Sequence, residues 1–278
     1  MKKNRRRTAL LLLLLLLVLP LGAQETKTLT VLQTSDMHSR VEPIDAAVAD
    51  RNAGKGGMVR RAALINQYRK EAPNLLLVDC GDFCQGTPYY NLFRGEVEVK
   101  LMNRMGYDAI TIGNHEFDYG MDNLARLFRL AKFSVVCANY DVKGTVLEDL
   151  VKPYVIVKRG DLKIGIFGVS PKLEGLVQAD KCVGVTYRDP VAAANEVAAL
   201  LKNKEKCHVV ICLSHLSAET DRTQLIPQTY NIDFVFGGHS HTFMKTEQNI
   251  ANLDGKKVPL LHSGKSGILV GRAQFVLK

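Results

Sequence analysis

Residues 109–116 read Ala-Ile-Thr-Ile-Gly-Asn-His-Glu, and this stretch decides the fold that we expect. Its first half is β-branched and apolar, which predicts a buried strand. Its second half is a glycine followed by an amide, an imidazole and a carboxylate, so the chain turns and presents polar groups where the strand ends. In an open α/β sheet, ligands bind beyond the carboxyl ends of the strands. The stretch therefore predicts one wall of a binding crevice.

Four other predicted strands end in the same way. Read alone, each of these segments could be an ordinary turn or a structural histidine. Their shared position favours a single site, because strand ends meet along one edge of a sheet. The predicted site residues are Asp36 and His38 after strand 29–34, Asp82 after 75–78, Asn114 and His115 after 109–112, His215 after 209–213, and His239 and His241 after 234–236. His262 also ends an apolar run, and it is either structural or a neighbour of the crevice.

The residue types in this set predict two metal ions. Imidazole suits Zn, Fe, Ni or Cu, whereas carboxylate and carbonyl oxygens suit harder ions such as Mn or Mg. Two carboxylates, one amide and four histidines exceed what one tetrahedral ion can bind. We therefore expect two divalent ions, such as Mn, Zn or Fe. Cys80 and Cys84 flank Asp82 and could supply thiolate, but the carboxylate and imidazoles already fill a mixed nitrogen and oxygen site.

Apolar, strand-like runs alternate with helical patterns through most of the chain. This alternation predicts a layered α/β fold with a largely parallel central sheet. The runs at 154–157 and 163–169, joined through Arg159-Gly160-Asp161, predict a hairpin instead. Further strands are predicted at 133–138, 259–262 and 268–277, and helices at 58–70, 97–105, 121–131 and 191–202.

The first 23 residues have the order of a signal peptide. Five Lys and Arg residues precede an apolar stretch at 10–19, and the small residues Gly22 and Ala23 follow. The apolar stretch is short for a bilayer span, which needs about 20 residues. We expect cleavage after Ala23 and a periplasmic or secreted protein. An uncleaved N-terminal anchor is the alternative.

The remaining 255 residues suit one catalytic domain, residues 24–278, with no linker to a second domain. The net charge of +9 includes five positive charges of the signal segment, so +4 remains. We therefore expect no nucleic-acid partner, and no membrane association after cleavage. The six cysteines permit disulfides, such as Cys80 with Cys84 or Cys182 with Cys207, but the sequence does not determine the pairing.

The five polar segments together resemble the motifs of the calcineurin-like metallophosphoesterase superfamily. The stretch 113–120, Gly-Asn-His-Glu-Phe-Asp-Tyr-Gly, and the stretch 237–242, Gly-Gly-His-Ser-His-Thr, resemble its 5'-nucleotidase and UDP-sugar hydrolase branch in particular. The resemblance covers essentially the whole exported chain. It implies an αββα sandwich with a two-metal site at the C-terminal ends of the strands.

The resemblance also implies a role for each site residue. A hydroxide between the two ions attacks the phosphate. His115, oriented by Asp118, stabilises the developing charge or protonates the leaving group. Glu116 supports the ligands and does not bind metal. The implied ligands are Asp36, His38 and His241 for the first ion, Asn114, His215 and His239 for the second, and Asp82 as the bridge.

The implied reaction is hydrolysis of phosphate esters, with nucleoside 5'-monophosphates as the favoured substrates. Members of this branch commonly carry a C-terminal domain that binds the base, and we find no counterpart of it before Lys278. Two alternatives are open. One is a phosphodiesterase or pyrophosphohydrolase that acts on cyclic nucleotides or nucleotide sugars. The other is a metal-holding catalytic subunit that is inactive until a separate chain supplies substrate binding.

Overall fold

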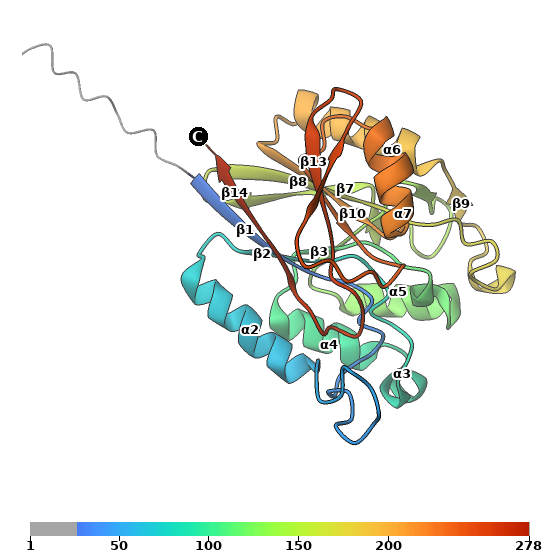
Figure 1. Cartoon of the computed structure of the whole chain (residues 1–278). Helices are drawn as coiled ribbons and strands as arrows, with labels where there is room; N and C mark the ends of the chain where they lie inside the picture. The colour runs from blue at the N-terminus through green and yellow to red at the C-terminus, as the bar shows by residue number, and fades with distance from the viewer. Residues whose placement is uncertain (1–26, 278) are drawn as a thin grey trace, which may run out of the picture.

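Two six-stranded β-sheets form the centre of the molecule in the computed structural model, which describes residues 27–277 (Figure 1). The predicted signal peptide, residues 1–23, lies outside the described residues. The two sheets pack face to face, and helices cover both outer faces. This is the αββα sandwich that the resemblance implies.

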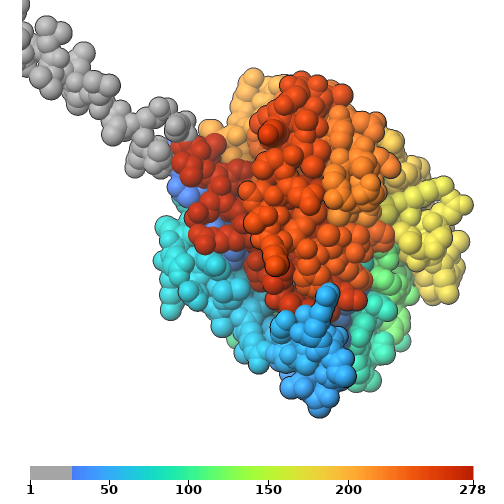
Figure 2. Space-filling model, viewed as in Figure 1, coloured from blue at the N-terminus to red at the C-terminus, as the bar shows by residue number. Residues whose placement is uncertain are grey.

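The first sheet has the strand order β14-β1-β2-β3-β4-β6. Strand β14 is antiparallel to β1, and the other neighbours are parallel. This pairing joins the two ends of the described chain, and Figure 2 shows the C-terminal segment beside the N-terminal one. The strands are β1 (Lys27–Thr34), β2 (Leu76–Asp79), β3 (Ala109–Ile110), β4 (Ser134–Val136), β6 (Val151–Lys152) and β14 (Gly271–Leu277).

The second sheet has the order β12-β13-β11-β10-β8-β7. Its four inner strands are parallel, and both edge strands are antiparallel to their neighbours. The predicted hairpin is confirmed as β7 and β8. The strands are β7 (Tyr154–Arg159), β8 (Leu162–Val169), β10 (Val209–Ser214), β11 (Phe234–Gly237), β12 (Gln248–Ala251) and β13 (Lys257–His262); β5 (Tyr140–Asp141) and β9 (Thr186–Tyr187) form a separate pair.

Side-chain alternation along the strands explains the layers. In β1, Leu29 and Val31 face the other sheet, whereas Leu32 faces the helices of the first sheet. Helix α5 (Gly120–Leu130), in the outer layer, buries Leu124 and Phe128 along one side.

Helices cover the outer face of each sheet. The helices over the first sheet are α2 (Met58–Glu71), α3 (Pro88–Phe93), α4 (Glu96–Met105) and α5. Those over the second sheet are α6 (Pro190–Ala199), which η3 (Leu200–Lys204) continues, and α7 (Ala218–Thr220), which η4 (Asp221–Leu225) and η5 (Ile226–Gln228) continue. No helix among residues 27–277 is long and apolar enough to cross a membrane.

The structure differs from the sequence patterns in several places. The parallel strands belong to two sheets and not to one central sheet. The predicted last strand, 268–277, begins only at Gly271, where its pairing with Gln33 of β1 starts. The elements α3, β5, β6, β9, β12 and α7 to η5 were not predicted, and most of them are too short to carry a periodic pattern.

All six cysteines are free thiols. The two pairs that the sequence permits, Cys80 with Cys84 and Cys182 with Cys207, are therefore not formed. Cys80 and Cys84 are both fully buried, and burial raises the pKa of each thiol well above its usual range. Neutral thiols are poor metal ligands, which agrees with a metal site made of nitrogen and oxygen atoms.

Candidate metal centre

The predicted site residues leave their strands in strained turns. Asp36, His38, Asp82, His239 and His241 all have positive φ angles, between 47° and 72°. Left-handed backbone conformations cost a non-glycine residue about 1–2 kcal/mol each. Such conformations cluster at functional sites, where the surrounding structure holds them in place. Five such residues in one set of turns indicate a functional site.

Backbone hydrogen bonds fasten the turns to one another. The N–H of Asp36 donates to the carbonyl of Gly81 at 2.9 Å, and the N–H of His38 donates to the carbonyl of Asp82 at 3.0 Å. A Cβ at Gly113 would lie 2.1 Å from Oδ1 of Asp82, so only glycine fits there. The sequence thus brings the ends of β1, β2 and β3 into direct contact.

The structure brings six predicted ligands together as two groups of three. The first is Asp36, His38 and His241, and the second is Asp82, His215 and His239; within each group the candidate ligand atoms lie within 4.8 Å of one another. The groups adjoin, because the N–H of His239 donates to Oδ1 of Asp36 at 3.0 Å. The first group has the three residues that the resemblance implies for one ion, and the second joins His215 and His239 to Asp82, the residue implied as the bridge. The seventh predicted ligand, Asn114, follows β3.

Several nitrogen and oxygen atoms of these residues lie close together, and some of them have no hydrogen-bond partner among the described residues. Nε2 of His38 and Nε2 of His241 are 2.8 Å apart. Nε2 of His215 lies 3.1 Å from Oδ2 of Asp82 but lacks hydrogen-bond geometry. Oδ1 of Asn114 is buried and has no partner among the described residues. Buried polar atoms are almost always paired. Lone pairs that converge in this way fit divalent cations, and the donors are types that Zn, Fe or Mn accept.

The electrostatics of the groups also favour cations. Burial lowers the pKa of His38 and of His239 to about 4, so both rings are neutral and have a lone pair to donate. Burial opposes ionisation of Asp82, yet His215 holds the pKa of this carboxyl below its usual range. Asp82 in turn raises the pKa of the buried His215 to about 10. A positive charge on His215 is therefore stabilised beside Asp82, and a bound cation would take the place of that charge.

His115 and Asp118 form a pair beside these groups. Nδ1 of His115 is 3.0 Å from Oδ2 of Asp118, and this hydrogen bond raises the pKa of the histidine. The N–H of His115 donates to Oδ1 of Asp82 at 2.9 Å. The ring of His115 lies 5.5 Å from that of His38, edge to face. The predicted acid thus stands at the metal groups, with one ring nitrogen already bound to Asp118.

Glu116 supports the ligand turns and does not lie among the ligands. Its fully buried carboxylate accepts three backbone N–H groups, from Asp82 at 2.9 Å, Gly113 at 2.6 Å and Cys84 at 3.1 Å. Burial and the charge of Asp82 raise the pKa of Glu116 to about 7. Glu116 thereby ties the turn after β2 to the turn after β3.

A second support, Asp79, was missed by the sequence analysis. It is fully buried, accepts the Thr34 hydroxyl at 2.6 Å and the Gly81 N–H at 2.9 Å, and has its pKa raised to about 8 by burial. The signal for it was an acid within an otherwise apolar strand. His262, left undecided, is buried, lies outside both groups and is 2.8 Å from Asp221.

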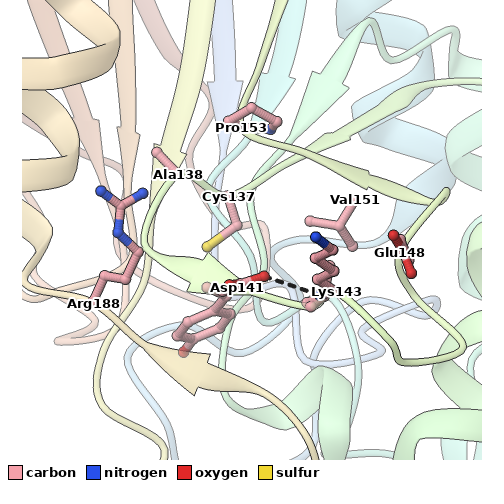
Figure 3. A pocket seen from close by; sticks show the side chains of 10 residues that line it. Cys137, Ala138, Asp141, Lys143, Glu148, Val151, Pro153 and Arg188 are labelled. Atoms are coloured by element: carbon pink, nitrogen blue, oxygen red, sulfur yellow. Dashed lines mark hydrogen bonds between the residues drawn. The ribbon is translucent and has the colours of Figure 1, made fainter.

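A cavity of about 490 Å³ lies near β4 and β5 and contains none of the predicted site residues. Cys137, Asp141, Lys143 and Arg188 are among its lining residues (Figure 3). The metal groups therefore do not belong to this cavity.

Two adjoining clusters of Asp and His side chains at the strand ends of an αββα sandwich are typical of hydrolases that use two metal ions. The chain belongs to the calcineurin-like phosphoesterase family, whose model matches residues 29–243. It is 34% identical over 271 residues to "Snake venom 5'-nucleotidase" of Crotalus adamanteus, covering 87% of this chain and 44% of that protein. It is 32% identical over 263 residues to human "5'-nucleotidase", covering 87% and 45%.

Solved structures agree with this assignment. A 5'-nucleotidase precursor from Thermus thermophilus superposes with a TM-score of 0.84 at 30% identity, over 91% of this chain and 53% of that one. The calcineurin-like phosphoesterase YfkN from Bacillus subtilis gives 0.75 at 29% identity, over 91% and 86%. The chain spans about half the length of the curated relatives that it matches. The predicted family, fold and enzyme class, a phosphoric ester hydrolase, are confirmed.

Proposed function

We propose that this chain hydrolyses phosphate monoesters, and nucleoside 5'-monophosphates in particular. The observation that carries the proposal is the position of His115 and Asp118 beside two adjoining metal-competent groups. A purely structural metal site does not need a histidine that is oriented by a carboxylate. The 5'-nucleotidase relatives support a nucleoside as the alcohol part of the ester.

In this proposal the side chains of the two groups hold two divalent ions, which when bound polarise the phosphate and supply an acidic water. Asp36, His38 and His241 would hold one ion, and Asn114, His215 and His239 would hold the other. Asp82 would serve both. The tight turns keep these donors in place before the substrate arrives, so binding needs little reorganisation.

His115 handles the leaving group. Hydrolysis adds water to phosphorus and breaks the bond between phosphorus and the ester oxygen, and that oxygen must gain a proton. Asp118 holds Nδ1 of His115 and raises its pKa, so the ring can carry a proton on Nε2. Transfer of this proton gives a neutral alcohol and inorganic phosphate. Asp118 orients the ring and stabilises its charged form.

Release of phosphate from AMP tests the proposal. The mature chain is assayed with added Mn beside His115→Ala, Asp82→Ala and a matched control, His208→Ala. His208 is exposed, and its Nδ1 accepts the Lys163 N–H away from both groups. We expect His115→Ala to lose about 10²–10⁴-fold in kcat, as is typical of a general acid. An aryl monophosphate run beside its bis-aryl diester separates a monoesterase from a diesterase. Preference for the diester, or an unaffected His115→Ala variant, contradicts the proposal.

We further propose that the chain is exported with removal of residues 1–23, and that a separate chain contributes to substrate binding. N-terminal sequencing of the protein from its native cells checks the export, and the proposal requires a mature chain that starts at Gln24. Co-purification of a second chain that lowers the KM for AMP checks the partner. A full-length N-terminus, or full activity with no bound partner, overturns the respective proposal.

A further inference from the structure

We infer that the ring of Tyr119 and the cavity beside it bind the leaving group of the substrate and select esters with an aromatic leaving group, such as a nucleoside. This inference rests on the proposed phosphomonoesterase function and deepens it. It assigns to this chain a subsite of its own for the alcohol part of the ester.

Tyr119 directly follows the turn that carries His115 and Asp118. Residues 115–117 form a 3₁₀ turn, and Asp118 continues it with right-handed helical angles. Side chains three positions apart in a 3₁₀ turn lie on one face. Asp118 therefore reaches His115, as their hydrogen bond shows, and Tyr119 is the next side chain along. In this inference, a group attached to the oxygen that His115 protonates extends toward this ring.

The ring of Tyr119 is exposed but held in position. Its exposed fraction is 38%, which is high for a large aromatic side chain. Tyr90 packs against it with ring centroids 5.1 Å apart, and the guanidinium of Arg94 lies 5.2 Å from the ring centre. The hydroxyl of Tyr90 also donates to the carbonyl of His115 at 3.4 Å. The aromatic platform is thus fixed relative to the catalytic turn.

Beside Tyr119 lies a cavity of about 470 Å³. Three segments wall it: the start of α5, the loop at 144–146 and the segment at 180–184. They are in contact, since a Cβ at Gly120 would lie 3.6 Å from Lys181 and one at Gly184 would lie 2.9 Å from Thr145. Small-molecule sites commonly measure about 300–1,000 Å³, so a nucleoside fits this space.

The walls suit a flat ring with polar edges. Val146 and Val183 supply apolar surface, with exposed fractions of 44% and 70%. Asp180 and Lys181 line the same cavity and provide an acceptor and a donor. Their ammonium and carboxylate are 3.4 Å apart and form an ion pair. An aromatic base that stacks on Tyr119 finds hydrogen-bonding groups at its edge.

Turnover of two monoesters tests the subsite. AMP carries an aromatic leaving group and glycerol 2-phosphate does not. The variants are Tyr119→Ala, Tyr119→Phe and the matched control Tyr230→Ala, whose ring is 36% exposed. We expect Tyr119→Ala to lower the ratio of kcat/KM for AMP to that for glycerol 2-phosphate by about tenfold or more, because stacking on one aromatic side chain is worth that much. We expect Tyr119→Phe and Tyr230→Ala to keep the wild-type ratio.

Val146→Trp provides a second route if Tyr119→Ala does not fold. The added ring fills the cavity and raises the KM for AMP relative to glycerol 2-phosphate. An unchanged ratio in either variant overturns the inference, while turnover of both esters still supports the phosphomonoesterase. If neither ester is turned over, calorimetric titration of the wild type and of Tyr119→Ala with adenosine tests the subsite independently of catalysis. Binding to the wild type that Tyr119→Ala weakens supports the subsite, and no binding overturns it.

Discussion

Glu116→Gln is the substitution that tests most directly how the ligand turns are held together. The carboxylate accepts N–H groups from Asp82 and Gly113 on Oε2 and from Cys84 on Oε1. Glutamine keeps the shape but has one oxygen and one amino group. If its oxygen replaces Oε2, two hydrogen bonds remain, and its amino group then faces the N–H of Cys84. Two donors are left opposed in a site with no access to water.

The magnitude follows from the number of bonds lost. A hydrogen bond to a charged group contributes about 1.5–3 kcal/mol, and a buried donor left without a partner costs about 1–3 kcal/mol. Near pH 4.5 the folded-state carboxyl is neutral, and there we expect Glu116→Gln to lower the free energy of unfolding by about 1–3 kcal/mol, the cost of the opposed donor. Burial raises the pKa of Glu116 from 4.5 to about 7, so the wild type loses stability as the pH rises through this range, the variant does not, and the difference shrinks. Glu116→Ala loses all three bonds, so its effect should be larger still.

Urea denaturation followed by circular dichroism measures both free energies, with a chelator present so that metal does not contribute. Glu219→Gln is the matched control, because Glu219 is exposed and pairs only with Arg222 on the surface. We expect the control to change stability by less than about 1 kcal/mol. If Glu116→Gln is as stable as the wild type, the three bonds do not anchor the turns and the reasoning fails.

Three more predictions follow from other parts of the structure. Asp233, away from the site, pairs with Lys202 at 2.6 Å and Lys256 at 2.8 Å; burial opposes its ionisation, but the two lysines hold its pKa below its usual range. A lowered pKa in the folded state stabilises it above pH 3.8, so Asp233→Asn should cost about 1–3 kcal/mol at pH 7, and urea denaturation should show the difference shrinking as the pH falls below about 4. A constant difference from pH 7 to pH 3 would contradict this. Gly113→Ala places a Cβ against the Asp82 carboxylate, so elemental analysis should find less bound metal than in the wild type. The same metal content as in the wild type would contradict this, because it would show that the turn can move to make room for the methyl group. Mn at one hundred times its Kd should raise the free energy of unfolding by about 2.7 kcal/mol for each site, and an unshifted thermal transition would argue against binding to the folded chain.

The candidate site could be predicted from sequence because each ligand lies within four residues of the end of a recognisable strand. The apolar runs before Asp82 and His215 are strong strand signals, and the end of a strand fixes where the next side chain emerges. The supports could not be predicted in the same way. Asp79 lies within a strand, and its partner Thr34 is 45 positions away, so only the paired strands show that the two side chains meet.

The division into two sheets was also hidden in the sequence. Strands β2 and β10 are buried on both faces and read as continuous apolar runs, so their pattern does not show which sheet they join. The hairpin of β7 and β8 was predictable, because a short turn at Gly160 leaves the two strands no other way to pair. Strands of two residues, such as β6, carry too little pattern to be seen.

We propose that the two Asp and His groups hold two divalent ions and that hydrolysis of phosphate monoesters requires these ions. The most direct measurement strips the purified chain with a chelator, returns Mn in steps and follows phosphate release from AMP at each step. We predict no turnover in the stripped chain and a plateau at two equivalents of metal per chain. Turnover without metal, or a plateau at one equivalent, would contradict the account.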